Sequence, residues 1–142
     1  MLFDLDNPVV ALCAAGMQVD GEPAQALALF EQAWAARTDD FEASVAAHFL
    51  ARHQATPADT VEWNERALRH ADALDPERAA PLLPSLCLNL ADAYRLSGRV
   101  AEARTVAARA ETALAHLPAN GYTEFVRMGL TRLLARLDAA GG

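Results

Sequence analysis

The sequence predicts an all-α fold built from antiparallel helical hairpins, and three observations support this prediction. The 142 residues are 53% hydrophobic but only 6% aromatic, and most of the apolar residues are Ala and Leu, which favour helices. Small residues recur after 34 residues and then after 43, with the nine extra residues falling between Asp72 and Pro84, and a period near 34 is typical of helical repeats. Capping residues separate the apolar stripes. Together these features predict about seven helices and no β-sheet.

The recurrence is clearest in the second helix of each expected hairpin. Ala26, Phe30 and Ala33 share one helix face, at positions i, i+4 and i+7. The equivalent positions in the two later copies are Thr60, Asn64 and Ala67, followed by Ala103, Ala107 and Ala110. Because one hairpin cannot bury its apolar face alone, the copies must stack.

The expected helix ends follow from turn and cap residues. Thr56-Pro57 and Asp75-Pro76 each place a capping side chain before a proline at the first helical position. Gly98 is a C-terminal stop, and Pro81 and Pro84 prevent one long helix from starting at Pro76. The expected helices span residues 8–19, 23–37, 40–54, 57–73, 84–97, 99–116 and 121–138, with a short turn before residue 84.

The residue pattern resembles that of the tetratricopeptide repeat family. The third copy carries the most matches, at Leu90, Ala91, Tyr94, Gly98, Ala103 and Ala110. The first copy matches at Ala14, Gly21, Ala26, Phe30 and Ala33, and the second mainly at Ala47 and Ala67. None of the three carries the family's proline at its end, where Thr38, Asp72 and Ala115 stand instead.

The resemblance extends over nearly the whole chain. It implies one domain over residues 1–142, with repeats at about 7–40, 41–74 and 84–117 and a terminal helix at 121–138. In that helix Phe125, Met128 and Gly129 take the bulky, Leu and small positions of the repeat. The implied architecture is a short right-handed α-solenoid.

Such a solenoid implies a function without catalysis, in which a peptide or protein segment binds in a concave groove lined by the first helix of each repeat. Transferred by position, the expected groove residues are Gln18, Glu42, Phe49, Arg52, Asn89, Asp92, Arg95 and Arg127. Two alternatives stay open: a self-assembling oligomerisation scaffold and, more remotely, an all-helical enzyme.

Charge and composition argue against several other classes of protein, including nucleic-acid-binding and membrane proteins. The net charge is −7 and the chain contains no lysine, which disfavours binding to nucleic acid. The apolar run near the N-terminus is shorter than the ~20 residues that cross a bilayer, so no membrane segment is expected. Cys13 and Cys87 form no CxxC motif, and a reducing cytoplasm is the expected location.

The sequence predicts no cofactor and no metal site. His48, His53, His70 and His116 include no pair at i+3 or i+4, so no helix presents two histidine ligands on one face. Cys13 and Cys87 fall on inward-facing stripes, where a free cysteine behaves as a small hydrophobe. Trp34 and Trp63 are expected to anchor the core rather than to hold a ligand.

The C-terminal helix has a wider apolar surface than one neighbour would cover. Val126, Leu130, Leu133 and Leu137 form the stripe that should be buried. Phe125, Met128 and Leu134 flank this stripe and form a possible homodimer surface. The alternative is that the N-terminal residues Leu2, Phe3 and Leu5 fold back over the helix.

Overall fold

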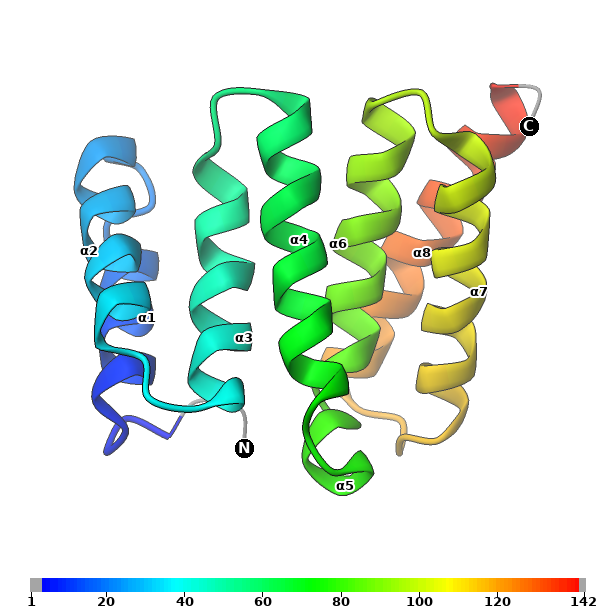
Figure 1. Ribbon diagram of the computed structural model, residues 1–142. Coiled ribbons are helices and arrows are strands. Elements are labelled where there is room, and N and C mark those ends of the chain that lie inside the picture. Colours follow the sequence, from blue (N-terminus) through cyan, green and yellow to red (C-terminus); the bar gives the residue numbers. More distant parts are fainter. Residues whose placement is uncertain (1–3, 141–142) are drawn as a thin grey trace. The chain divides into compact units, whose positions relative to one another are not determined.

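The computed structural model describes residues 4–140, and these residues form an all-helical protein without strands (Figure 1). The all-α prediction is therefore confirmed. The chain divides into two compact units, an N-terminal unit of residues 1–74 and a C-terminal unit of residues 75–142. The single domain over residues 1–142 stays a prediction, and each unit is described by itself.

The N-terminal unit consists of two hairpins. Its elements are α1 (Pro8–Gln18), α2 (Pro23–Ala36), α3 (Asp40–Leu50), the 3-10 helix η1 (Ala51–His53) and α4 (Pro57–Asp72). Helix α1 pairs with α2, and α3 pairs with α4. Helix α3 also packs on both α1 and α2, so the second hairpin stacks on the first through its leading helix.

The C-terminal unit contains one hairpin and a terminal helix. Its elements are α5 (Pro76–Ala79), α6 (Leu83–Leu96), α7 (Val100–Ala115) and α8 (Gly121–Ala139). Helix α6 pairs with α7, and α8 packs on both of them, as α3 does on α1 and α2. The same packing pattern therefore occurs once in each unit.

The described residues contain eight α-helices, one more than expected. The additional helix is α5, which occupies part of the turn expected before residue 84. It forms because the Asp75 carboxylate accepts a hydrogen bond from the Arg78 backbone N–H at 3.0 Å and Pro76 has a helical φ. It stays short because Pro81 and Pro84 provide no backbone N–H.

The other helix ends agree with the expected boundaries within a few residues. The Thr56 hydroxyl caps α4 by accepting a hydrogen bond from the Asp59 backbone N–H at 3.1 Å. At the end of α6, Gly98 has a φ of +76°, which glycine adopts without strain. This conformation lets the Arg99 N–H bond to the Tyr94 carbonyl at 2.8 Å and ends the helix.

The alanines at the repeated positions lie where helices approach closely. Ala33, Ala67 and Ala110 are each 0% exposed, as the sequence predicted. In the N-terminal unit, the Ser44 hydroxyl of α3 donates to the Ala67 carbonyl of α4 at 2.8 Å. Larger side chains would not fit at these contacts, because protein interiors are close-packed.

Helix α6 begins without a side-chain cap of its own, and α8 supplies one. The Tyr122 hydroxyl accepts a hydrogen bond from the Ser85 N–H at 3.3 Å and donates one to the Pro81 carbonyl at 2.9 Å. Burial raises the pKa of Tyr122, although hydrogen bonds from Ser85 partly oppose this rise. The phenol therefore stays neutral and fastens the start of α8 to the start of α6.

Candidate binding surfaces

The reactive side chains singled out from the sequence are mostly buried or dispersed. Burial raises the pKa of Cys13 to about 12, which keeps its thiol protonated, and Cys87 is also buried. Desolvation, with the charge of Arg52 as a smaller contribution, lowers the pKa of His48 to about 4. Across residues 4–140, no group of three His, Cys, Asp or Glu side chains could hold a metal ion.

Glu42 was expected in the groove, but the structure places it in a buried polar junction. Its side chain is 8% exposed and accepts hydrogen bonds from the Thr38 backbone N–H at 2.7 Å and hydroxyl at 2.9 Å. The Asn7 amide, which caps α1, donates a third bond at 3.0 Å. Glu42 thus joins the start of α1 to the connection between α2 and α3 and is not available as a contact residue.

Phe49, another expected groove residue, belongs to the core of the N-terminal unit. It is 4% exposed, and its ring stacks on the ring of Phe30 with centroids 5.2 Å apart. On its other side it meets the His48 ring edge-on at 5.1 Å. The groove role expected for Glu42 and Phe49 is corrected, because both side chains are enclosed.

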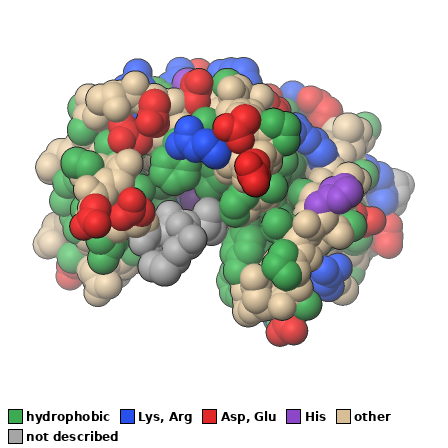
Figure 2. Space-filling view, turned by 90° about the horizontal axis from the view of Figure 1, so that it is seen from below, with side chains coloured by type: hydrophobic (Ala, Val, Ile, Leu, Met, Phe, Trp, Pro, Cys, Tyr) green, Lys and Arg blue, Asp and Glu red, His purple; other side chains and the backbone are tan. Residues whose placement is uncertain are grey.

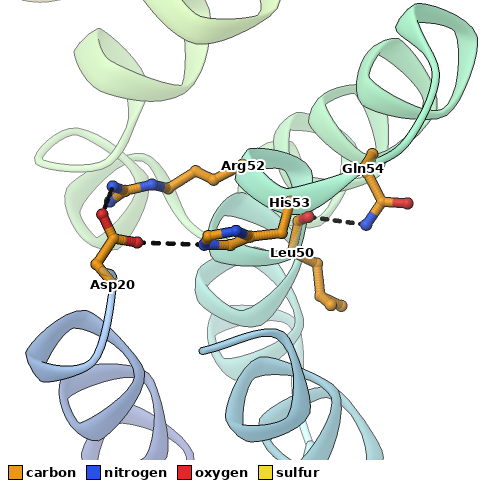
Figure 3. Close-up of polar contacts among 5 residues, drawn as sticks. All are labelled: Asp20, Leu50, Arg52, His53 and Gln54. Carbon is orange, nitrogen blue, oxygen red and sulfur yellow. Dashed lines mark hydrogen bonds and ion pairs between the residues drawn. The ribbon is translucent and has the colours of Figure 1, made fainter. Parts of the chain in front are cut away.

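Gln18 and Arg52 are both exposed, Gln18 at the end of α1 and Arg52 just after α3. Figure 3 shows Arg52 and its neighbours. The Arg52 guanidinium lies 2.8 Å from a carboxylate oxygen of Asp20 in the α1–α2 turn. The other Asp20 oxygen is 3.2 Å from Nε2 of His53. The Gln54 amide donates to the Leu50 carbonyl at 2.8 Å and closes the end of α3. Asp20 therefore tethers the first hairpin to the second.

Three of the expected groove residues share one side of α6, at a spacing of three residues. Asn89, Asp92 and Arg95 are half-buried there, and the Arg95 guanidinium pairs with the Asp92 carboxylate at 2.9 Å. Leu96 lies beside them and is 62% exposed. We call these four residues the α6 face. Sequence reasoning missed Leu96, although its spacing of i+7 from Asn89 places it on the same side of the helix.

Arg127, the last expected groove residue, does not join the α6 face. It shares a stripe of α8 with Asp138, which lies about three turns further on. The Asp138 carboxylate is 3.0 Å from the Arg104 guanidinium of α7, so this stripe of α8 faces α7. Gly129, on the opposite side of α8, lies against Leu88 of α6. Arg127 itself is exposed, and its place in the groove stays a prediction.

The apolar surface expected on α8 is present only in part. Val126, Leu130, Leu133 and Leu137 are all buried, as predicted. Phe125 is 76% exposed and Met128 is 56% exposed. Leu134 is only half-buried, and its part in a dimer surface stays a prediction. Leu5 is itself 63% exposed, while Leu2 and Phe3 lie outside the described residues.

The two tryptophans form a half-buried cluster on α2 and α4. Their rings meet edge to face with centroids 4.9 Å apart. The Arg37 guanidinium lies 3.7 Å from the Trp34 ring centre, and the Arg66 guanidinium lies 4.5 Å from that of Trp63. The two rings pack between α2 and α4, as expected of residues that anchor the core. Each ring also has an edge at the surface, and an arginine guanidinium covers it.

Charges of both signs occur together on the surface. Figure 2 shows acidic, basic and apolar side chains interspersed over the face that it presents. No helix within residues 4–140 is both long and apolar enough to cross a bilayer. Comparison of the chain with protein-family models, curated proteins and solved structures finds no match.

Proposed function

We propose that the chain is a protein–protein interaction module that binds a peptide or protein segment through the first helices of its hairpins. The observation that carries this proposal is the α6 face. It combines Leu96, an exposed apolar side chain, with the amide of Asn89 and the ion pair of Asp92 and Arg95. Interfaces commonly surround an apolar contact with polar groups that fix the register of the partner.

The resemblance to tetratricopeptide repeats adds to this proposal. In that reading the hairpins belong to a right-handed α-solenoid, whose first helices line the binding groove. The support is the packing of α3 on α1 and α2, and of α8 on α6 and α7. At the end of the N-terminal unit, Gln18 and Arg52 would contribute further polar contacts, and Arg52 would stay anchored by Asp20.

The proposal can be tested by capture from native lysate with two matched double variants. Arg52→Ala/Arg95→Ala removes one positive charge from each unit, the first in η1 directly after α3 and the second in α6. Arg69→Ala/Arg109→Ala removes the same charges from α4 and α7, which are second helices. The first variant should lose the captured protein and the second should retain it. Equal capture by both variants would contradict a role for the first helices.

Self-assembly is the second candidate function, and the exposed Phe125 and Met128 of α8 favour it. These two residues are neighbours at i and i+3, and contiguous exposed apolar surface marks places where a protein meets another protein. Light scattering tests this candidate, since a scaffold must form oligomers by itself, and a chain that stays monomeric would contradict it.

A further inference from the structure

The exposed side of α8 carries a continuous seam that extends over almost the whole helix. Residues spaced alternately by four and three lie along one line of an α-helix, as in coiled coils. The members of the α8 seam, all exposed, are Gly121, Phe125, Met128, Arg132, Ala135 and Ala139. No acidic residue interrupts it. The buried stripe that packs on α6 and α7 lies on the other side, so α8 has a second surface suited to a helix.

We propose that a second copy of this chain packs on the α8 seam in antiparallel orientation, about a two-fold axis close to Met128. This proposal is independent of the α6 face and adds an assembly to the binding function. A two-fold pair is the commonest closed arrangement of identical chains and requires a self-complementary surface.

Two charged residues, Glu124 beside the seam and Arg132 within it, favour the antiparallel orientation. Glu124 precedes Met128 by four residues and Arg132 follows it by four, and both are exposed. An antiparallel pair centred on Met128 brings each Glu124 level with the partner copy's arginine at the position of Arg132. Like charges of the two copies are then about 12 Å apart along the axis. That separation exceeds the screening length of about 8 Å in physiological salt.

A parallel pair would have the opposite charge pattern. It would place the two Glu124 carboxylates at the same level, and likewise the two Arg132 guanidinium groups. Like charges facing each other across two helices disfavour an assembly. The charges of Glu124 and Arg132 therefore select the antiparallel orientation.

The sizes of the seam residues fit the same orientation. At the centre, Met128 meets its counterpart, and the Phe125 ring lies near the guanidinium of the partner copy's arginine, which favours a cation–π contact. Toward the ends, Gly121 is level with the alanine equivalent to Ala135. Small residues there let the two backbones approach, so that the central Phe and Met side chains can be enclosed.

Sedimentation velocity of the full chain over a range of concentrations tests the dimer. The wild type should shift from monomer to dimer as the concentration rises into the high micromolar range. Phe125→Glu should abolish the shift. Met17→Glu, which places the same charge at a methionine of α1 that is 42% exposed, should leave it unchanged. A wild type that stays monomeric would overturn the proposal.

Charge reversal tests the orientation and does not depend on Phe125. Glu124→Arg and Arg132→Glu should each raise the dimer dissociation constant about tenfold, because each creates two like-charge pairs across the interface. The double variant Glu124→Arg/Arg132→Glu restores opposite charges and should recover the wild-type dissociation constant. Far-UV circular dichroism verifies that each variant is folded. A double variant that dimerises no better than the single variants would overturn the antiparallel pairing.

Discussion

Replacement of Gly16 by alanine tests the packing of the N-terminal unit at its closest point. A Cβ atom at this position would overlap Cε1 of the Phe30 ring and lie 2.8 Å from its Cδ1 and Cζ atoms. The ring cannot move aside easily. It is 0% exposed and is stacked between Phe49, at 5.2 Å, and His53, at 5.5 Å.

The expected magnitude follows from two opposing effects. Alanine inside a helix is more favourable than glycine by about 1 kcal/mol. Overpacking of a core costs about 1–3 kcal/mol, and the fixed Phe30 ring favours the upper end of that range. We therefore expect Gly16→Ala to lower the free energy of unfolding by about 2 kcal/mol.

Gly129→Ala is the matched control, because it makes the same change inside α8. There a Cβ would lie 2.8 Å from Cδ2 of Leu88, the end of a flexible side chain. Leu88 can rotate away, so this variant should be unchanged or more stable by up to about 1 kcal/mol.

Tryptophan fluorescence during urea unfolding reports on the unit that contains Gly16, since Trp34 and Trp63 are the two tryptophans of the chain and both belong to that unit. Far-UV circular dichroism follows both units. A Gly16→Ala variant as stable as the wild type, or no less stable than Gly129→Ala, would refute the packing described for Phe30.

Three further stability predictions can be checked by urea unfolding. Ala67→Leu should lower the free energy of unfolding by about 1–3 kcal/mol, because the larger side chain overpacks a site that is 0% exposed. Tyr122→Phe should lower the free energy of unfolding by about 1–2 kcal/mol, because the Pro81 carbonyl loses the hydroxyl that donates a hydrogen bond to it. For Glu42, burial raises the pKa, but hydrogen bonds from Thr38 and then from Asn7 outweigh it and hold the pKa below its usual value of 4.5. A pKa that is lower in the folded state than in the unfolded state stabilises the fold at pH values above the unfolded-state pKa. Glu42→Gln should therefore unfold with a smaller free energy than the wild type at neutral pH. This difference in free energy should narrow as the pH falls below about 4.5.

The helices and much of the core could be predicted from the sequence because their signals are local. Thr56 and Gly98 mark ends through residues within one turn, and the structure confirms both. Ala33, Ala67 and Ala110 are buried because their spacing follows the helix period. The short helix α5 was missed because it has only four residues, which is too few to show a periodic apolar pattern, although Asp75-Pro76 signals the start of a helix.

The candidate site could be predicted only in part, because burial of polar side chains depends on distant partners. Glu42 resembles an exposed acid in a first helical turn, and its bond to Asn7 joins residues 35 positions apart. Phe49 is covered by the Phe30 ring of another helix, which no spacing within α3 reveals. The repeat pattern also does not fix the rotation of α8, which is set by the contacts of Gly129 and Asp138 with neighbouring helices.

Site-specific photocrosslinking at Leu96 tests the proposed binding function most directly. A photoreactive side chain at position 96 lies in the α6 face, and the same group in place of Ala108 lies on an exposed part of α7. On irradiation in native lysate, the group at position 96 should yield a defined covalent adduct with another protein, and the group at position 108 should not. Absence of an adduct from position 96, or equal adducts from both positions, would contradict binding through the first helices.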